Sequence, residues 1–136
     1  MSQENVEVTR RAVNATTAGD PDRFLACLHP EVVREEGGDV LPGLRGTYRG
    51  HTEARRWFEE AILEVWETFH VEVREITDAS DGRVFLETVF TARGAGSGAE
   101  AELIFWNVFW FEDGTVAKRR VFQNRDEALE AAGLQE

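Results

Sequence analysis

Two polar residues stand out in this sequence because their surroundings suit acid–base chemistry. Glu36 borders a glycine-rich segment, and Asn107 interrupts the aromatic run at 103–111. A carboxylate in an apolar pocket becomes a better general base, because burial disfavours its charged form. A buried amide must find hydrogen-bond partners, and it can polarise a substrate oxygen. The alternatives are that Glu36 forms an exposed pair with Glu35 and that Asn107 bonds to neighbouring backbone groups.

A third candidate is His51, which lies at the entry of an aromatic helical segment and can titrate near neutral pH. Its alternative is an ordinary surface histidine beside a helix. Further along, only one of Arg119 and Arg120 can point inward, because neighbouring side chains of a strand alternate. An inward arginine could pair with Glu87 or hold the carboxylate of a ligand. The candidate ligand-binding residues are Trp57, Phe58, Glu87, Phe109, Arg119 and Gln123.

The sequence argues against metal and cofactor sites. The three histidines show no i, i+4 spacing, and the single cysteine, Cys27, excludes an internal disulfide. Cys27 lies beside an apolar stripe, so we expect a small buried side chain. The glycines at 94–98 lack the lysine and the following helix of a phosphate-binding loop. We therefore expect no metal and no cofactor.

Composition sets the broad class. The chain has 136 residues, which predicts a single domain over 1–136. A net charge of −11 opposes binding to nucleic acid or anionic membranes. No apolar stretch is long enough to span a bilayer, and the first residues do not resemble a signal peptide, so we expect a cytoplasmic protein. The preference for arginine over lysine is typical of a GC-rich, bacterial genome.

The elements that would position these residues begin with helices. Apolar spacing predicts a first helix over 4–18, with Gly19 as its stop. A short second helix is expected between the Asp-Pro at 20–21 and the His-Pro at 29–30. A strand over 32–36 and a glycine-rich loop over 37–50 follow.

The third helix is expected to start at Thr52, a suitable N-cap residue. Its wide apolar stripe is expected to lie across a sheet and comprises Ala54, Trp57, Phe58, Ala61, Ile62, Val65 and Trp66. The second half of the chain is rich in strands. We expect strands over 69–78, 83–93, 100–111 and 115–123, and a closing helix from Asn124 to Gly133. This order indicates an α+β fold with helices on one face of a curved sheet.

The strand at 103–111 is apolar on both faces, unlike a sheet with one wet face. If Asn107 and Phe109 face a cavity, Trp106 and Trp110 face the other way. Exposed aromatic patches of this kind mark interfaces, so we expect a homodimer through the outer sheet face. The alternative is a central strand that is fully buried within one chain.

The order of elements, with four segments, resembles the SnoaL-like branch of the nuclear transport factor 2-like superfamily. The segments are T-A-G-D-P-D-R-F at 17–24, Y-R-G-H-T-E-A-R-R-W-F at 48–58, F-E-D-G-T-V at 111–116 and R-D-E-A-L-E-A-A-G-L at 125–134. The resemblance implies an α+β cone of three N-terminal helices on a curved mixed or antiparallel sheet, with a short C-terminal helix. It also implies a pocket between helices and sheet, and usually a homodimer. Members include steroid isomerases, polyketide cyclases, epoxide hydrolases, dehydratases and non-catalytic binders.

The resemblance also implies roles for single positions. The base of a steroid isomerase falls on Glu36, and its strand acid falls on Asn107. Its helix tyrosine falls near Ala12, which has no donor, and this argues against steroid isomerisation. A cyclase pattern could use Glu36 or His51. An epoxide-hydrolase pattern needs a relay of two acids and one arginine on facing strands. Glu87 and either Arg119 or Arg120 could form part of it, but no second acid is evident.

Two functions remain open at this point. The first is a cofactor-independent isomerase, cyclase or dehydratase with Glu36 as base and Asn107 as polariser. The second is a non-catalytic protein that binds a small hydrophobic molecule or serves as a dimeric structural unit. The fold alone does not decide between them.

Overall fold

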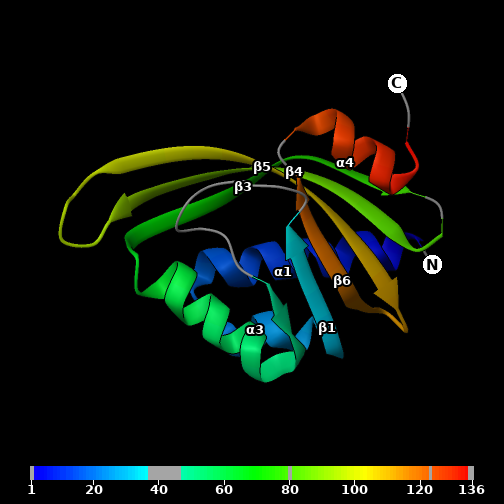
Figure 1. The fold of residues 1–136 in the computed structure, drawn as a ribbon, viewed down its shortest axis with the longest axis horizontal. Helices are drawn as coiled ribbons and strands as arrows, with labels where there is room; N and C mark the ends of the chain where they lie inside the picture. The colour runs from blue at the N-terminus through cyan, green and yellow to red at the C-terminus, as the bar shows by residue number, and fades with distance from the viewer. Residues whose placement is uncertain (1, 37–46, 80, 123, 135–136) are drawn as a thin grey trace.

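The computed structural model describes residues 2–36, 47–79, 81–122 and 124–134. Figure 1 shows a strongly curved sheet with α1 and α3 on its concave side and α4 on the opposite side. The fold class is α+β, as the sequence predicted. The arrangement is a cone whose interior lies between the helices and the sheet.

Two helices open the chain as expected. Helix α1 spans Ser2–Ala18 and is followed by Gly19, whose positive φ of 67° stops it. Helix α2 spans Pro21–Ala26, and Asp20 caps it by accepting a hydrogen bond from the backbone N–H of Arg23. The helix ends before the His-Pro pair that was expected to end it, because strand β1 (Leu28–Glu36) already includes that pair. The register of β1 shifts between Leu28 and Val33, consistent with the missing N–H of a proline in this stretch.

The third helix is shorter than the apolar stripe predicted. A two-residue strand, β2 (Tyr48–Arg49), precedes α3 (Gly50–Phe58), and Thr52 is an exposed helix residue rather than the cap. The π-helical turn η1 (Glu59–Leu63) then continues α3, and the N–H of Glu64 donates to the carbonyl of Glu59 over 2.9 Å. A π turn adds a residue and shifts the helix phase.

That phase shift changes the end of the stripe. Val65 is 40% exposed instead of facing the core. Trp66 starts strand β3, where it pairs with Gly94 instead of closing the helix.

Six strands form one mixed sheet in the order β2-β1-β6-β5-β4-β3. The long antiparallel strands are β3 (Trp66–Ala79), β4 (Arg83–Gly94), β5 (Glu100–Glu112) and β6 (Thr115–Phe122). Strand β1 joins β6 in the parallel sense. Register shifts in β3 and between Trp110 and Phe111 bend the strands, which gives the sheet its curvature.

Helix α4 (Arg125–Ala132) packs on the outer face of the sheet, so the expectation that all helices share one face is wrong. Its buried Ala128 and Leu129 contact a second core that includes Phe85, Val108 and Phe122. The main core lies on the inner face and includes Phe24, Phe58, Leu86 and Phe109. One strand can therefore be apolar on both faces because each face has its own cover within the chain.

Candidate ligand-binding cavity

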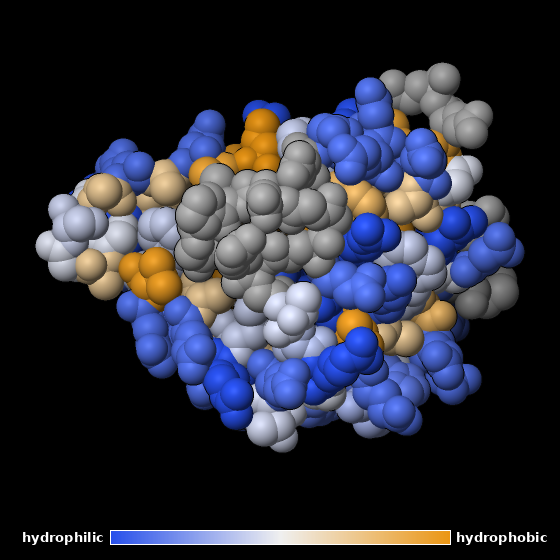
Figure 2. Space-filling model, viewed as in Figure 1, coloured by the Kyte–Doolittle hydropathy of each residue, from blue (hydrophilic) through white to orange (hydrophobic). Residues whose placement is uncertain are grey.

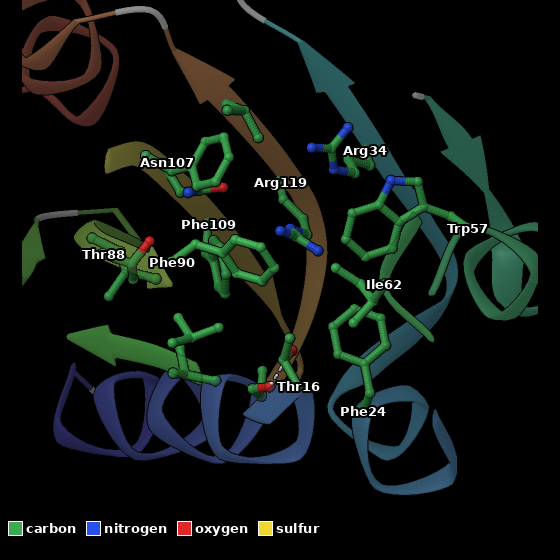
Figure 3. Close-up of a pocket in the computed structure, with 16 residues that line it drawn as sticks. Thr16, Phe24, Arg34, Trp57, Ile62, Thr88, Phe90, Asn107, Phe109 and Arg119 are labelled. Carbon is green, nitrogen blue, oxygen red and sulfur yellow. Dashed lines mark hydrogen bonds between the residues drawn. The ribbon is translucent and has the colours of Figure 1, made fainter. Parts of the chain in front are cut away.

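A cavity of about 100 Å³ lies between the concave sheet face and the helices. Alternation along β4 and β5 selects the residues of these two strands that line it: Leu86, Thr88, Phe90, Phe105, Asn107 and Phe109. Figure 3 shows Asn107, Thr88 and Phe90 on one side of this space and Arg34, Arg119 and Trp57 on the other. The walls are mainly aromatic and aliphatic.

The helices close the cavity from the other side. Ala12, Val13 and Thr16 of α1 contribute small side chains, and the Thr16 hydroxyl donates to the carbonyl of Ala12 over 3.0 Å. Trp57 of α3 packs against Tyr48, with ring centroids 5.6 Å apart. Trp57 also packs against Phe24, at 6.2 Å. Aromatic packing of this kind holds the rings rigidly around the space.

Asn107 is the buried amide of the cavity. It is 5% exposed, and its Oδ1 atom has no hydrogen-bond partner within the described part of the chain. Its Cα partners are Leu86 on β4 and Val121 on β6, both apolar cavity residues. A buried carbonyl without a partner is costly, so this oxygen is available to a ligand donor.

Alternation also decides which arginine of β6 points inward. Arg119 lines the cavity, whereas Arg120 lies over the Phe122 ring of the outer core at 5.2 Å. The neighbouring Cα partner of Arg119 on β1 is Arg34, which is 4% exposed and also lines the cavity. Two guanidinium groups therefore enter the cavity from adjacent strands, on the side of Trp57 (Figure 3).

Aromatic rings surround the Arg119 guanidinium. Its central carbon lies 5.2 Å from the Trp57 ring centre, 5.4 Å from that of Phe109 and 5.9 Å from that of Phe24. One Nη1 atom donates to the Tyr48 hydroxyl over 3.2 Å, and the buried Nε has no hydrogen-bond partner. These contacts hold the cation by ring faces rather than by a carboxylate.

The two sequence candidates for acid–base chemistry differ in placement. The backbone of Glu36 pairs with Val121, so Glu36, Val121 and Asn107 form one row across β1, β6 and β5. The side chain of Glu36 lies outside the described residues. His51 does not line the cavity; its Nε2 lies 3.0 Å from the Leu28 carbonyl, which fixes the start of α3 against β1.

The residues that the sequence predicted as ligand contacts also differ in placement. Trp57, Phe109 and Arg119 line the cavity. Phe58 does not, because its side chain is fully buried against Phe24 with ring centroids 4.9 Å apart.

Glu87 was expected in the cavity, and this is wrong. It lies on the outer face, where it accepts hydrogen bonds from Trp106 Nε1 at 2.7 Å and from Arg125 Nη1 at 3.1 Å. It therefore cannot form a relay with Arg119. Gln123 lies outside the described residues.

Sequence reasoning missed Arg34, although a signal existed. Val32 and Arg34 are two residues apart in a strand, and both are buried, at 0% and 4% exposure. Period-2 alternation would have placed Arg34 on the same inward face as Val32. An arginine followed by two glutamates reads as a surface residue, which hid this signal.

The sequence also raised expectations for the cysteine and for possible metal ligands. Burial raises the pKa of the Cys27 thiol, so the buried cysteine is less reactive than a free thiol at neutral pH. Among the described residues, no group of three or more His, Cys, Asp or Glu side chains is placed to hold a metal ion.

The fold and cavity define the class of protein. The model of the SnoaL-like domain family matches residues 9–119, and the chain belongs to this family. It has the nuclear transport factor 2-like cone fold that the sequence resemblance implied. None of the curated proteins matches the sequence. Within the described part of the chain, no helix is long and apolar enough to cross a membrane.

Solved structures show the same fold at low identity. A nuclear transport factor 2-like protein of unknown function from Burkholderia pseudomallei is 22% identical, with a TM-score of 0.75, and the match covers 95% of this chain and 97% of that one. TerC, crystallised with polyporic acid, is 22% identical with a TM-score of 0.73 over 95% and 97%. An LEH-like epoxide hydrolase from Mycobacterium tuberculosis is 19% identical with a TM-score of 0.72 over 96% and 92%.

Proposed function

We propose that this protein binds a small, mainly hydrophobic molecule in the cone cavity. The observation that carries the proposal is a largely apolar cavity with a few convergent polar groups, above all the Asn107 oxygen, which has no hydrogen-bond partner among the described residues. Such a combination is typical of small-molecule sites. The fold-mate TerC was crystallised with an organic ligand, polyporic acid, which supports a binding role for this cone.

The cavity sets a size limit. At about 100 Å³ it is smaller than the roughly 300–1,000 Å³ of drug-sized pockets. An apolar cavity of about 150 Å³ holds a benzene ring. The cavity is smaller than this in the present conformation, so a molecule with one ring requires Trp57 or neighbouring side chains to move.

Nuclear magnetic resonance can test the binding proposal. Trp57 is the cavity tryptophan, whereas Trp66, Trp106 and Trp110 do not line the space. Titration with benzyl alcohol and phenylacetamide is expected to shift the Trp57 indole N–H signal selectively, and a Trp57→Phe variant assigns that signal.

A cavity-filling variant supplies the control. Ala12→Leu adds three carbons to the α1 wall and is expected to abolish the shift, whereas Ala18→Leu, at an exposed position of the same helix, leaves it unchanged. Equal shifts in wild type and Ala12→Leu would contradict binding in this cavity.

A second candidate function is cofactor-independent acid–base catalysis by Glu36 and Asn107. It is favoured by their common row across three strands, which separates their Cα atoms by about 10 Å at the usual strand spacing. In this scheme a planar substrate would lie over Val121, which stands between Glu36 and Asn107 in the row. The chemistry would be isomerisation, cyclisation or dehydration, with Glu36 removing a proton and Asn107 donating a hydrogen bond to the developing oxyanion.

Glu36→Gln separates the two functions. A binding protein keeps its ligand affinity after this change, whereas an acid–base enzyme loses turnover by about 100-fold or more. Glu35→Gln is the matched control, because Glu35 pairs with Lys118 at 3.4 Å instead of facing the cavity row. If Glu36→Gln retains full turnover of a converted ligand, Glu36 is not the base.

The partner proposal is a homodimer through the outer sheet face around Trp106 and Trp110. Helix α4 covers one part of this face, and Ile104 beside it is 39% exposed. The side of the molecule drawn in Figure 2 is mostly hydrophilic, with small apolar patches. A second copy of the chain would cover the remaining apolar groups.

A further inference from the structure

The charged groups of the cavity are unusual for a site that takes a hydrophobic molecule. Its described lining includes two arginines, Arg34 and Arg119, and no acidic residue. They are Cα partners on the parallel strands β1 and β6, so both guanidinium groups reach the same region. Both also face one ring, because their central carbons lie 4.8 Å and 5.2 Å from the centre of Trp57.

Arg119 has more donor capacity than its partners use. A guanidinium offers five N–H donors, and among the described residues its one hydrogen-bond acceptor is the Tyr48 hydroxyl. The other contacts are aromatic faces, which accept the charge but leave the donors in the ring plane unused. A charge held in an apolar site without a counter-ion is costly, and an anionic ligand would offset this cost.

Two acids close to these strands bind other cations on the outer face of the sheet. Glu35 points to the other face and pairs with Lys118, and Glu87 pairs with Arg125 there. Glu36 follows Arg34 by two positions along β1. Among the described residues, Arg119 has no carboxylate partner, so its positive charge can be offset by a ligand.

We propose that the natural ligand is a monoanion with a hydrophobic ring, and that Arg119 binds its carboxylate or enolate oxygen. This inference rests on the proposed function and specifies the ligand class for the same cavity. The anionic group lies against Arg119 and Trp57. The ring extends toward Phe90 and Phe109, and the Asn107 oxygen accepts a hydrogen bond from any hydroxyl on it (Figure 3).

The test compares two probes of nearly equal shape, phenylacetate and phenylacetamide, by isothermal titration calorimetry at pH 7 and low salt. A hydrogen-bonded ion pair with Arg119 is expected to give phenylacetate a tenfold to hundredfold advantage. Arg119→Gln is expected to remove this advantage. Arg120→Gln, which changes the adjacent outward arginine, is expected to keep it.

The outcomes are separable from those of the proposed function. Equal binding of both probes by the wild type would overturn the anion inference and leave the binding cavity in place. Binding of neither probe would overturn both. If Arg119→Gln does not fold, the wild-type comparison still decides. Arg119→Lys then gives a second measurement, because it keeps the charge, loses the planar fork and is expected to keep only part of the advantage.

Discussion

At the scale of single residues, Asn107 is a polar group in an apolar part of the core. Its side chain is buried among apolar groups and its Oδ1 has no partner in the described part of the chain. We predict that Asn107→Leu stabilises the ligand-free protein by about 1 kcal/mol, because it removes an unsatisfied buried oxygen at similar volume. Urea denaturation measures this difference. The same change is expected to weaken binding of ligands that donate to the amide.

The reverse exchange on the neighbouring strand is the control. Leu86 is the Cα partner of Asn107 and is 2% exposed. Leu86→Asn is expected to destabilise the protein by about 2–4 kcal/mol, through a lost apolar contact and a new unpaired amide. A clear loss of stability in Asn107→Leu would show that the amide makes an essential structural contact instead.

The same residue scale shows what the sequence could predict of the site. The period of two along β5 correctly placed Asn107 and Phe109 inward and Trp106 and Trp110 outward. The same rule applied to β4 would have placed Glu87 outward, since Leu86 and Thr88 flank it and line the cavity. Glu87 was instead expected in the cavity as a partner for an inward arginine, and strand geometry overrides that chemical expectation.

At the scale of elements, helix α4 is fixed at both ends by polar contacts. Asn124 caps its start by accepting from the N–H of Glu127, and Arg83 Nη1 donates to the Ala131 carbonyl over 3.0 Å near its end. Arg125, in its first turn, bonds to Glu75 Oε1 of β3 over 2.6 Å. These contacts join the helix to the outer face of the sheet.

The Glu75–Arg125 pair predicts a pH-dependent contribution to stability. Hydrogen bonding to Arg125 lowers the pKa of Glu75 below its usual 4.5. The contribution is therefore fully present above about pH 4.5 and is lost as pH falls through the lowered value. We predict that Glu75→Gln costs less than about 1 kcal/mol at pH 7, since the pair is partly solvent-screened, and that this cost shrinks as pH falls below 4.5.

Chemical denaturation of both proteins across this pH range measures the effect. Glu72→Gln, at an exposed position of the same strand, is the matched control and is expected to change little at any pH. A Glu75→Gln cost that persists undiminished at pH 3 would mean that the side chain contributes by packing rather than by charge.

Local signals predicted most element boundaries. Asp20, Asn124 and Gly133 act as caps as their residue types indicated. The π turn and the two-residue β2 were missed, because each depends on contacts with distant segments rather than on local preference. For example, the Ala95 N–H donates to the Val65 carbonyl over 3.0 Å, which directs the chain into β3 where helical spacing suggested a further turn.

At the scale of the whole molecule, the two faces of the sheet have different covers. The concave face is closed by α1, α2 and α3, whereas α4 covers only part of the convex face (Figure 1). The amphipathic pattern of a short terminal helix does not determine which face of the sheet the helix packs on. The sequence therefore predicted the apolar outer face of β5 without predicting that the chain itself covers part of it.

The part of the convex sheet face that α4 leaves uncovered is the basis of the dimer prediction. Ile104 is 39% exposed, and Trp106 and Trp110 are only half-buried by their Glu87 and Lys118 contacts. With a net charge of −11, two copies repel at long range, so association requires an apolar contact that excludes water. We predict a dimer in solution by light scattering, and predict that Ile104→Lys converts it to a folded monomer, because a buried lysine without a partner opposes the interface.

Val65→Lys is the matched control for the dimer. Val65 is 40% exposed, nearly the same as Ile104, but it lies in the turn before β3 rather than on the outer face of β5. If both variants remain dimeric, the copies associate through another surface. If the wild type is monomeric at high concentration, α4 and the polar contacts of the two tryptophans are sufficient cover for the outer face, and the ligand cavity works within a single chain.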